Sequence, residues 1–156
     1  MMVTITAYTD EYCQAVADLF TQAVHAIDDE FYSKEQKAAW APLDIDYYRW
    51  QQRLKSKHCF LALADKQLLG FIELAADYID CFYVAPQHQG KAVGQALYQH
   101  VESIAREQKL AGLRVDASLV AKDFFSKQGF AVVSHNQLLR LGIRLQNISM
   151  YKGFYS

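Results

Sequence analysis

The chain has 156 residues and a mass of 17.8 kDa, which is enough for one domain with a hydrophobic core of ordinary size. Sixteen Lys and Arg residues against 17 Asp and Glu give a net charge of -1, so the chain lacks the basic excess with which nucleic-acid-binding proteins neutralise phosphates. Hydrophobic residues make up 52% of the chain, with seven Gly and only two Pro, which excludes a disordered or fibrous protein.

The first half of the chain is predicted to contain a short strand, three helices and a run of three strands. Residues 3–7 alternate in a way that suits a strand, and Asp10 and Glu11 favour the start of a helix that continues through about residue 27. Pro42 divides the next segment into two short helices, near residues 33–39 and 44–56. Strands are then predicted at residues 59–64, 68–76 and 78–85.

The second half is predicted to alternate helices and strands. A helix opens after residues 89–94 and continues to about Gln108. We found no repeat, linker or low-complexity tract, so one domain is expected to span residues 1–156. The remaining elements are a strand at 113–115, a short helix at 119–128, and strands at 130–135 and about 143–154.

The cysteines and the N-terminal residues bear on the cellular compartment. Three cysteines without C-x-x-C spacing predict neither a disulfide framework nor a zinc site, and no other metal site is predicted. Acidic residues Asp10 and Glu11 precede any apolar run of signal-peptide length, and no segment reaches the ~18 apolar residues of a membrane helix. We therefore expect a cytoplasmic protein that binds neither membranes nor nucleic acids.

The most informative segment is the loop between the third strand of the meander and the long helix. The strand ends with the sequence YVAP at residues 83–86, and QGKAVG at residues 89–94 leads into the helix. Unpaired N–H groups and the positive end of the helix dipole point outward together at such a turn. Glycine lets a ligand approach the backbone without a side chain in the way, so the segment is typical of a phosphate-binding loop.

At this point the sequence resembles the GNAT superfamily of acetyl-CoA-dependent N-acetyltransferases, in which a strand runs into a loop of pattern Gln/Arg-x-x-Gly-x-Gly/Ala. The loop here departs from the pattern at Ala92, where a glycine is usual. Residues 121–125 and 128–130 resemble the family's A-x-x-F-Y-x-x-x-G-F helix and turn, and residues 32–42 are similar to a bacterial subgroup. The resemblance implies an α/β (α+β) fold with a central mixed, mostly antiparallel sheet that is splayed and flanked by helices.

The same resemblance implies acetyl-CoA as a cosubstrate. In the family the pantetheine arm adds to the gap between two splayed strands and bonds to free backbone groups there. In this chain Phe82 and Val84 would offer those groups, or Cys81 and Tyr83 if the register differs by one residue. The implied pyrophosphate-binding and thiol-contacting residues are Gln89, Gly90, Lys91, Ala92, Val93, Gly94 and Phe125.

The transfer reaction needs a base, because an amine is mostly protonated at neutral pH and cannot then attack a thioester. Asp80 lies in an otherwise apolar strand beside the expected thioester, where the family often places an acid, and it is the predicted base. Glu73 is the second choice. The alternative for Asp80 is that its carboxylate satisfies a nearby backbone group or arginine.

The family's usual general acid is a tyrosine that would fall at Phe125, which has no proton to give. Ser118, Tyr83 or Tyr151 are candidates to replace it, or the thiol leaves without an acid. Ser118 is the preferred catalytic candidate of these, and its alternative role is to cap the helix that follows.

Residues 28–48 contain six acids against two lysines, with aromatic residues interleaved. In this fold the segment commonly forms a wall of the acceptor site, so we expect a small, cationic amine held by carboxylates and by the rings of Tyr32 and Trp40. The alternative is that the acids form a solvated helix face and the aromatic rings pack in the core.

These features predict an enzyme that acetylates a primary amine by direct transfer in a ternary complex. Cys81 near the thioester would allow a covalent acetyl-enzyme instead, but the sequence offers it no evident His partner. A second hypothesis is a CoA-binding or small-molecule-binding module that keeps the fold with little turnover. A third is an enzyme for longer acyl-CoA substrates. An exposed last strand would support a homodimer.

Overall fold

The computed structural model describes residues 2–56 and 58–155. These residues form one seven-stranded sheet, in which β4 and β5 run parallel and the other neighbouring strands run antiparallel. This confirms the predicted mixed, mostly antiparallel sheet. In spatial order the strands are β1 (Thr4–Ala7), β2 (His58–Ala64), β3 (Gln67–Ala75), β4 (Tyr78–Val84), β5 (Gly112–Ala117), β7 (Ile143–Gly153) and β6 (Ala131–Arg140).

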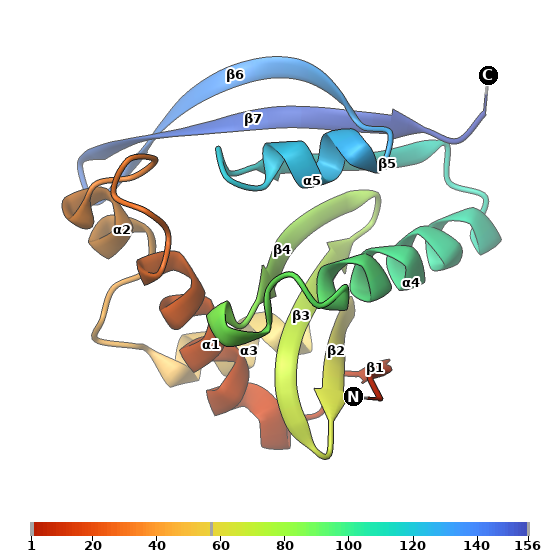
Figure 1. Ribbon diagram of the computed structural model, residues 1–156, viewed down its shortest axis with the longest axis horizontal. Coiled ribbons are helices and arrows are strands. Elements are labelled where there is room, and N and C mark those ends of the chain that lie inside the picture. The colour runs from red at the N-terminus through yellow and green to blue at the C-terminus, as the bar shows by residue number, and fades with distance from the viewer. Residues whose placement is uncertain (1, 57, 156) are drawn as a thin grey trace.

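Helices cover both faces of the sheet (Figure 1). One face carries α1 (Cys13–His25), α2 (Lys34–Trp40) and α3 (Tyr47–Lys55), and the other carries α4 (Val93–Glu107) and α5 (Lys122–Lys127). Short 3-10 turns precede α1 and α4, at Asp10–Tyr12 and Pro86–His88. Within the described ranges, no helix is both long and apolar enough to cross a bilayer.

The alternating side chains of the central strands divide the core into two parts. Leu61 and Phe71 pack with α1 and α3, whereas their neighbours Ala62 and Ile72 pack with α4. Because strands β2 and β3 are buried on both faces, they appear in the sequence as continuous apolar runs. The two-residue turn between them has positive φ at both residues, as a type I′ hairpin requires.

Strands β4 and β5 separate soon after they meet. They pair only at Tyr78 with Arg114 and Ile79 with Val115, and beyond these pairs the two strands diverge (Figure 1). The register of β4 on β3 shifts at the same place. Ile79 pairs with Leu74 and Cys81 pairs with Glu73, so two steps along β4 correspond to one step along β3. Asp80 is the extra residue of this β-bulge, which re-aims its side chain at the point where the strands part.

The C-terminal hairpin differs from the sequence prediction. The sixth strand was predicted to end at residue 135, but β6 continues to Arg140 and pairs along its length with β7. Leu141 and Gly142, both with positive φ, form the tight turn that allows this extension. The last strand, β7, lies between β5 and β6, so the prediction of an exposed last strand is wrong, and β6 forms the edge.

Candidate active site

The gap between β4 and β5 exposes backbone groups of β4. The amide of Ala85 donates to the carbonyl of Leu69 on β3, at 2.8 Å. Along a strand, every second residue directs its amide and carbonyl to the same neighbouring strand. The backbone groups of Cys81 and Tyr83 therefore also face β3, whereas the amides and carbonyls of Phe82 and Val84 face the gap. The Gln89 side chain donates to the Val84 carbonyl at 3.4 Å, consistent with this orientation. Of the two registers left open by the sequence, the structure has the Phe82 and Val84 register.

The loop at residues 89–94 turns directly into α4. Gly90 has φ +78°, and a Cβ there would meet no atom within 4 Å, so the backbone is open to an approaching molecule. Gly94 lies close to β4, where an added Cβ would be 3.2 Å from Cζ of Phe82. The Val93 side chain is buried in the core, while Gln89 and Lys91 are exposed. The first N–H groups of α4 therefore face outward beside the end of the gap.

Ala92 is the residue at which this loop departs from the usual glycine, and its backbone is in the left-handed region with φ +64°. A left-handed conformation is costly for alanine and free of steric cost for glycine. Ala92→Gly should therefore raise the free energy of unfolding by about 1 kcal/mol. Urea denaturation followed by circular dichroism measures this change.

Ala96, one turn later in α4, provides the matched control for this prediction. It has helical backbone geometry inside the helix, so Ala96→Gly should lower the free energy of unfolding by about 1 kcal/mol. The same substitution should thus have opposite signs at two positions four residues apart. Destabilisation by Ala92→Gly would contradict the assignment of backbone strain to Ala92.

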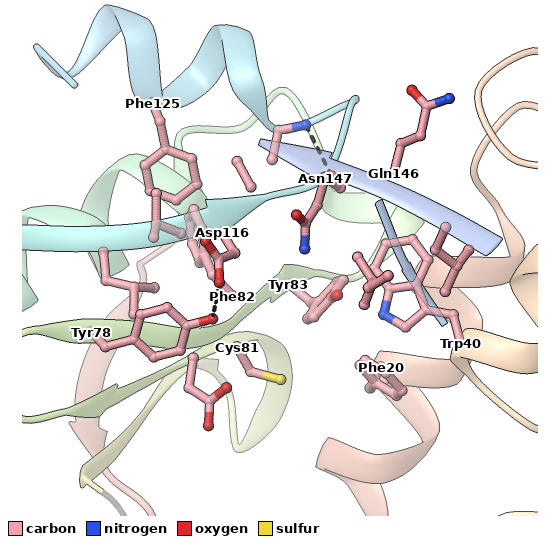
Figure 2. A pocket seen from close by; sticks show the side chains of 18 of the residues that line it. Phe20, Trp40, Tyr78, Cys81, Phe82, Tyr83, Asp116, Phe125, Gln146 and Asn147 are labelled. Atoms are coloured by element: carbon pink, nitrogen blue, oxygen red, sulfur yellow. Dashed lines mark hydrogen bonds between the residues drawn. The ribbon is translucent and has the colours of Figure 1, made fainter. Parts of the chain in front are cut away.

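A cavity of about 260 Å³ passes through the gap between β4 and β5. Figure 2 shows its two ends, with Phe125 at one and Phe20 and Trp40 at the other. Side chains from both faces of the sheet thus reach a common space. The lining residues include Ile79, Asp80, Cys81, Phe82, Tyr83, Val115, Asp116, Ala117 and Ser118 from the two strands and the residue after β5, and Leu138, Arg140, Leu145, Gln146 and Asn147 from the hairpin.

Asp80 lies on the cavity wall in an ion pair with Arg53 of α3. Its carboxylate is 3.5 Å from Nη2 of Arg53, and about a quarter of its side chain is exposed. The same guanidinium donates through Nε to the fully buried Glu73, at 3.3 Å, and through Nη2 to Sγ of Cys81, at 3.0 Å. The arginine contact anticipated as the alternative for Asp80 is thus present. Glu73 is absent from the described cavity lining and lies beneath Arg53.

Tyr78 and Asp116 form a second polar group on the same wall, at the narrow end of the gap. The Tyr78 hydroxyl donates to Asp116 at 3.0 Å, as Figure 2 shows. Burial, together with this hydrogen bond to a carboxylate, raises the pKa of Tyr78 to about 12, so the hydroxyl remains protonated at neutral pH. Ser149 donates to the other carboxylate oxygen at 2.5 Å.

Aromatic rings line the opposite end of the cavity. Tyr83 packs edge-on to Phe20, with ring centroids 5.0 Å apart, and Trp40 packs against Tyr32 at 5.2 Å. Burial raises the pKa of Tyr83 well above its ordinary value, so its hydroxyl also stays protonated. The Tyr32 hydroxyl donates to the carbonyl of Gln146 and accepts from the amide of Leu119, which ties the residues just before α2 to β7 and to the segment before α5.

Tyr32 and Trp40 both line the cavity, although Tyr32 is also a core residue with 2% of its surface exposed, and the predicted carboxylates are not part of this wall. None of the six acids of residues 28–48 is among the described residues that line the cavity. Asp29 instead pairs with Lys37 at 2.7 Å, and Asp46 caps α3 by accepting from the amide of Arg49. The acidic side chains that reach the cavity are Asp80 and Asp116.

Phe125 and Ser118 line the end of the cavity nearest α5. Phe125 is buried within a cluster of rings and packs edge-on to Phe82 with centroids 5.8 Å apart. The Ser118 hydroxyl accepts from the amide of Ala121 at 3.1 Å, and so caps the turn that leads into α5, in keeping with the alternative role expected for this serine. Tyr151, the third candidate acid, is absent from the described lining.

Sequence reasoning missed several lining residues for one common reason. Arg53 is one of several charged residues in α3, and Asp116 falls just after the strand that was predicted at 113–115. Arg140 belongs to the part of the hairpin that was not predicted, whereas Gln146 and Asn147 lie in the predicted last strand, which carried no sign that it borders the cavity. Their place in the cavity depends on contacts between segments far apart in the chain, for which a single sequence gives no signal.

Comparisons with known proteins agree with this geometry. Residues 28–152 match the family described as acetyltransferase (GNAT) domain. The chain is 32% identical over 137 residues to the uncharacterized N-acetyltransferase YafP of Escherichia coli K12, a match that covers 88% of this chain and 87% of that protein.

Solved structures show the same architecture. A GCN5-related N-acetyltransferase from Rhodopseudomonas palustris superposes with a TM-score of 0.93 at 30% identity, covering 99% of this chain and 97% of that one. The PaiA N-acetyltransferase from Thermoplasma acidophilum, solved in complex with coenzyme A, superposes with a TM-score of 0.80 at 20% identity, covering 99% of this chain and all of that one. The chain therefore belongs to the GNAT family of acetyltransferases and is an acyltransferase.

Proposed function

We propose that this acyltransferase moves the acetyl group of acetyl-CoA to the primary amine of a small, cationic acceptor, by direct attack in a ternary complex. The observation that carries the proposal is the cavity that passes through the gap between β4 and β5. A donor bound in the gap and an acceptor on the face that carries α1–α3 could meet there without a covalent enzyme intermediate. Such positioning removes much of the entropic barrier to transfer.

The residues around the gap fit acetyl-CoA, which supplies an acetyl thioester when bound. The backbone groups of Phe82 and Val84 are available to a pantetheine arm, and the loop at residues 89–94 offers N–H groups to a pyrophosphate. The neighbour from T. acidophilum, which was solved with coenzyme A, supports this assignment. Phe125 and Phe82 would provide the apolar surroundings of the sulfur.

Asp80 is the proposed base. Its position supports this role, because the carboxylate lies beside the gap on the face of the sheet that carries α3, where we propose that the acceptor binds. It takes one proton from the ammonium group, after which the nitrogen lone pair forms a bond to the thioester carbonyl carbon. When the C–S bond breaks, the nitrogen passes its second proton to the Ser118 oxygen while the Ser118 hydroxyl gives its own proton to the thiolate, so CoA leaves as a thiol and the serine is restored. The proton on Asp80 returns to solvent.

Ser118 is the proposed source of the proton for the leaving thiolate. Its oxygen accepts the hydrogen bond from Ala121, so its own O–H proton remains to be donated toward the cavity. This arrangement lets the cap and the catalytic role coexist. Phe125 cannot serve, since its side chain carries no ionisable proton.

Ser118→Ala tests the two roles of this serine together. Loss of the cap should lower the free energy of unfolding by about 1 kcal/mol, measured by urea denaturation. Loss of a proton donor should also lower kcat for acetyl-CoA, while Ser118→Thr should restore much of both. A stability loss with unchanged kcat would leave the cap as the sole role of Ser118.

The acceptor is proposed to be cationic because of the charges around the reacting end of the cavity. Asp80 and Asp116 line the cavity together with Arg53 and Arg140, and Glu73 pairs with Arg53 beneath it. Three carboxylates against two guanidinium groups leave one negative charge. Tyr32 and Trp40 add aromatic faces, which also attract cations.

The proposed function is tested by detecting CoA thiol with DTNB while the protein is mixed with acetyl-CoA and a panel of amines. We expect thiol release with cationic primary amines and much less with amines of similar size that carry a carboxylate. Calorimetric binding of CoA without thiol release for any amine would identify a CoA-binding module instead. Mass spectrometry after incubation with acetyl-CoA alone should show no acetylated Cys81, since an acetyl-enzyme would contradict direct transfer.

A further inference from the structure

We propose that Asp116 and Tyr78 form, together with Asp80, a clamp that holds the acceptor as a primary ammonium group and selects it over secondary amines. This inference rests on the proposed function and specifies which amines the same site accepts. It assigns a binding role to Asp116 and Tyr78, which the proposed mechanism leaves without one.

The strand register places the two aspartates on either side of the gap. Ile79 and Val115 form the last pair between β4 and β5, and Asp80 and Asp116 are the next residues on the two strands. Ile79 and Val115 pack with α4, so the residues that alternate with them face the acceptor side. Both carboxylates line the same cavity, and the clamp therefore spans the point where the strands part.

Asp116 is fixed by a chain of hydrogen bonds that spans four strands. Tyr78 donates to one carboxylate oxygen at 3.0 Å, and Ser149 donates to the other at 2.5 Å. Asn136 in turn donates to the Ser149 hydroxyl at 2.7 Å. Both donors hold the carboxylate in one orientation, so Asp116 does not need to reorganise when an acceptor arrives.

These contacts also decide what kind of ligand the wall takes. The Tyr78 proton is committed to Asp116, which leaves only lone pairs on the Tyr78 oxygen for a ligand (Figure 2). Asp116 likewise offers only lone pairs. The Tyr78–Asp116 pair is therefore an acceptor-only surface, and the matching ligand is a hydrogen-bond donor with positive charge.

A primary ammonium group has enough N–H bonds for both halves of the clamp. One proton goes to Asp80 and two N–H bonds remain, of which Asp116 or Tyr78 holds one. That contact restricts rotation of the amine and directs its lone pair at the gap. A secondary amine keeps only one N–H bond after a proton passes to Asp80. That bond reaches Asp116 or Tyr78 only when the second carbon substituent points away from the clamp, so fewer orientations of the amine make the contact.

The test uses the best primary amine of the DTNB panel and its N-methyl derivative. The wild-type protein should prefer the primary amine in kcat/KM by about tenfold or more. Asp116→Asn should raise KM for the primary amine and bring the ratio of the two kcat/KM values closer to one. Tyr78→Phe should have a smaller effect in the same direction. Asp77→Asn, which removes an acid paired with Arg114 outside the cavity, is the matched control and should change neither value.

The outcomes separate the clamp from the proposed function. Retention of both KM and amine preference by Asp116→Asn overturns the clamp while leaving acetyl transfer intact. Failure of the wild-type protein to acetylate any amine overturns the proposed function itself. Thermal denaturation of each variant shows whether it folds. If Asp116→Asn does not fold, Tyr78→Phe decides, because it keeps the carboxylate and its bond from Ser149, and an unchanged preference then overturns the clamp.

Discussion

Replacing Asp80 by Asn is expected to lower kcat/KM for acetyl transfer by about 10²–10⁴-fold. The amide has nearly the same shape as the carboxylate but cannot accept a proton from the ammonium group. The variant should also lose the fall in kcat/KM that protonation of the base causes at low pH. A pH profile of DTNB-detected thiol release, with the wild type measured in parallel, gives both quantities.

The fold should survive this change, because Arg53 keeps its contacts with Glu73 and Cys81. Asp77→Asn again serves as the control, since Asp77 lies beside Asp80 in sequence but pairs with Arg114 and is absent from the described lining. If Asp80→Asn keeps the wild-type rate and the acidic limb, Asp80 has no part in the chemistry. Its role is then the ion pair with Arg53.

Replacing Glu73 by Gln is expected to lower the free energy of unfolding by about 2–3 kcal/mol. Glu73 is fully buried, and its carboxylate is closer to the Arg53 guanidinium than that of Asp80 is. The nearest N···O distance is 3.2 Å for Glu73 and 3.5 Å for Asp80. Removing that charge leaves the guanidinium partly uncompensated at the floor of the cavity. The expected value is at the low end for buried pairs because about a third of the Arg53 side chain is exposed. Urea denaturation measures the change.

A double-mutant cycle shows whether the effect comes from the pair. Adding Arg53→Met to Glu73→Gln should recover part of the lost stability, because the unpaired guanidinium is removed. Asp10→Asn is the control for an exposed pair: Asp10 lies 3.9 Å from Lys55, also in α3, and its loss should cost less than about 1 kcal/mol. Equal losses at Asp10 and Glu73 would contradict the importance assigned to burial.

The phosphate-binding loop and the strand before it could be predicted because their signals are local. Glycines, a proline and an apolar stripe mark the end of β4 and the start of α4 within about 15 consecutive residues. The helix face at Val93, Leu97 and Val101 follows from spacing alone, and all three side chains are buried. The conformation of Ala92 could not be predicted, because alanine carries no sequence signal for positive φ.

The β6–β7 hairpin was underestimated because its turn signal is weak. β6 is largely exposed, so it shows no continuous apolar run, and a Leu-Gly turn is less distinctive than Asn-Gly or Asp-Gly. The hairpin nevertheless provides much of one cavity wall. The interpretation of residues 28–48 failed in a related way, since composition identified the acids but not the directions in which they point.

The sequence by itself determined the order of the helices and strands and the position of the loop before α4. It also showed which aromatic and acidic residues β4 carries. Periodicity and turn chemistry act over a few residues, so a single sequence records them. Tertiary structure alone decided which side chains share the cavity. Arg53 meets Glu73 and Asp80 only because α3 packs on the central strands, and Asp116 meets Tyr78 only because β4 and β5 become parallel neighbours. Such encounters depend on the closure of long loops and on packing between distant segments, which no local pattern records.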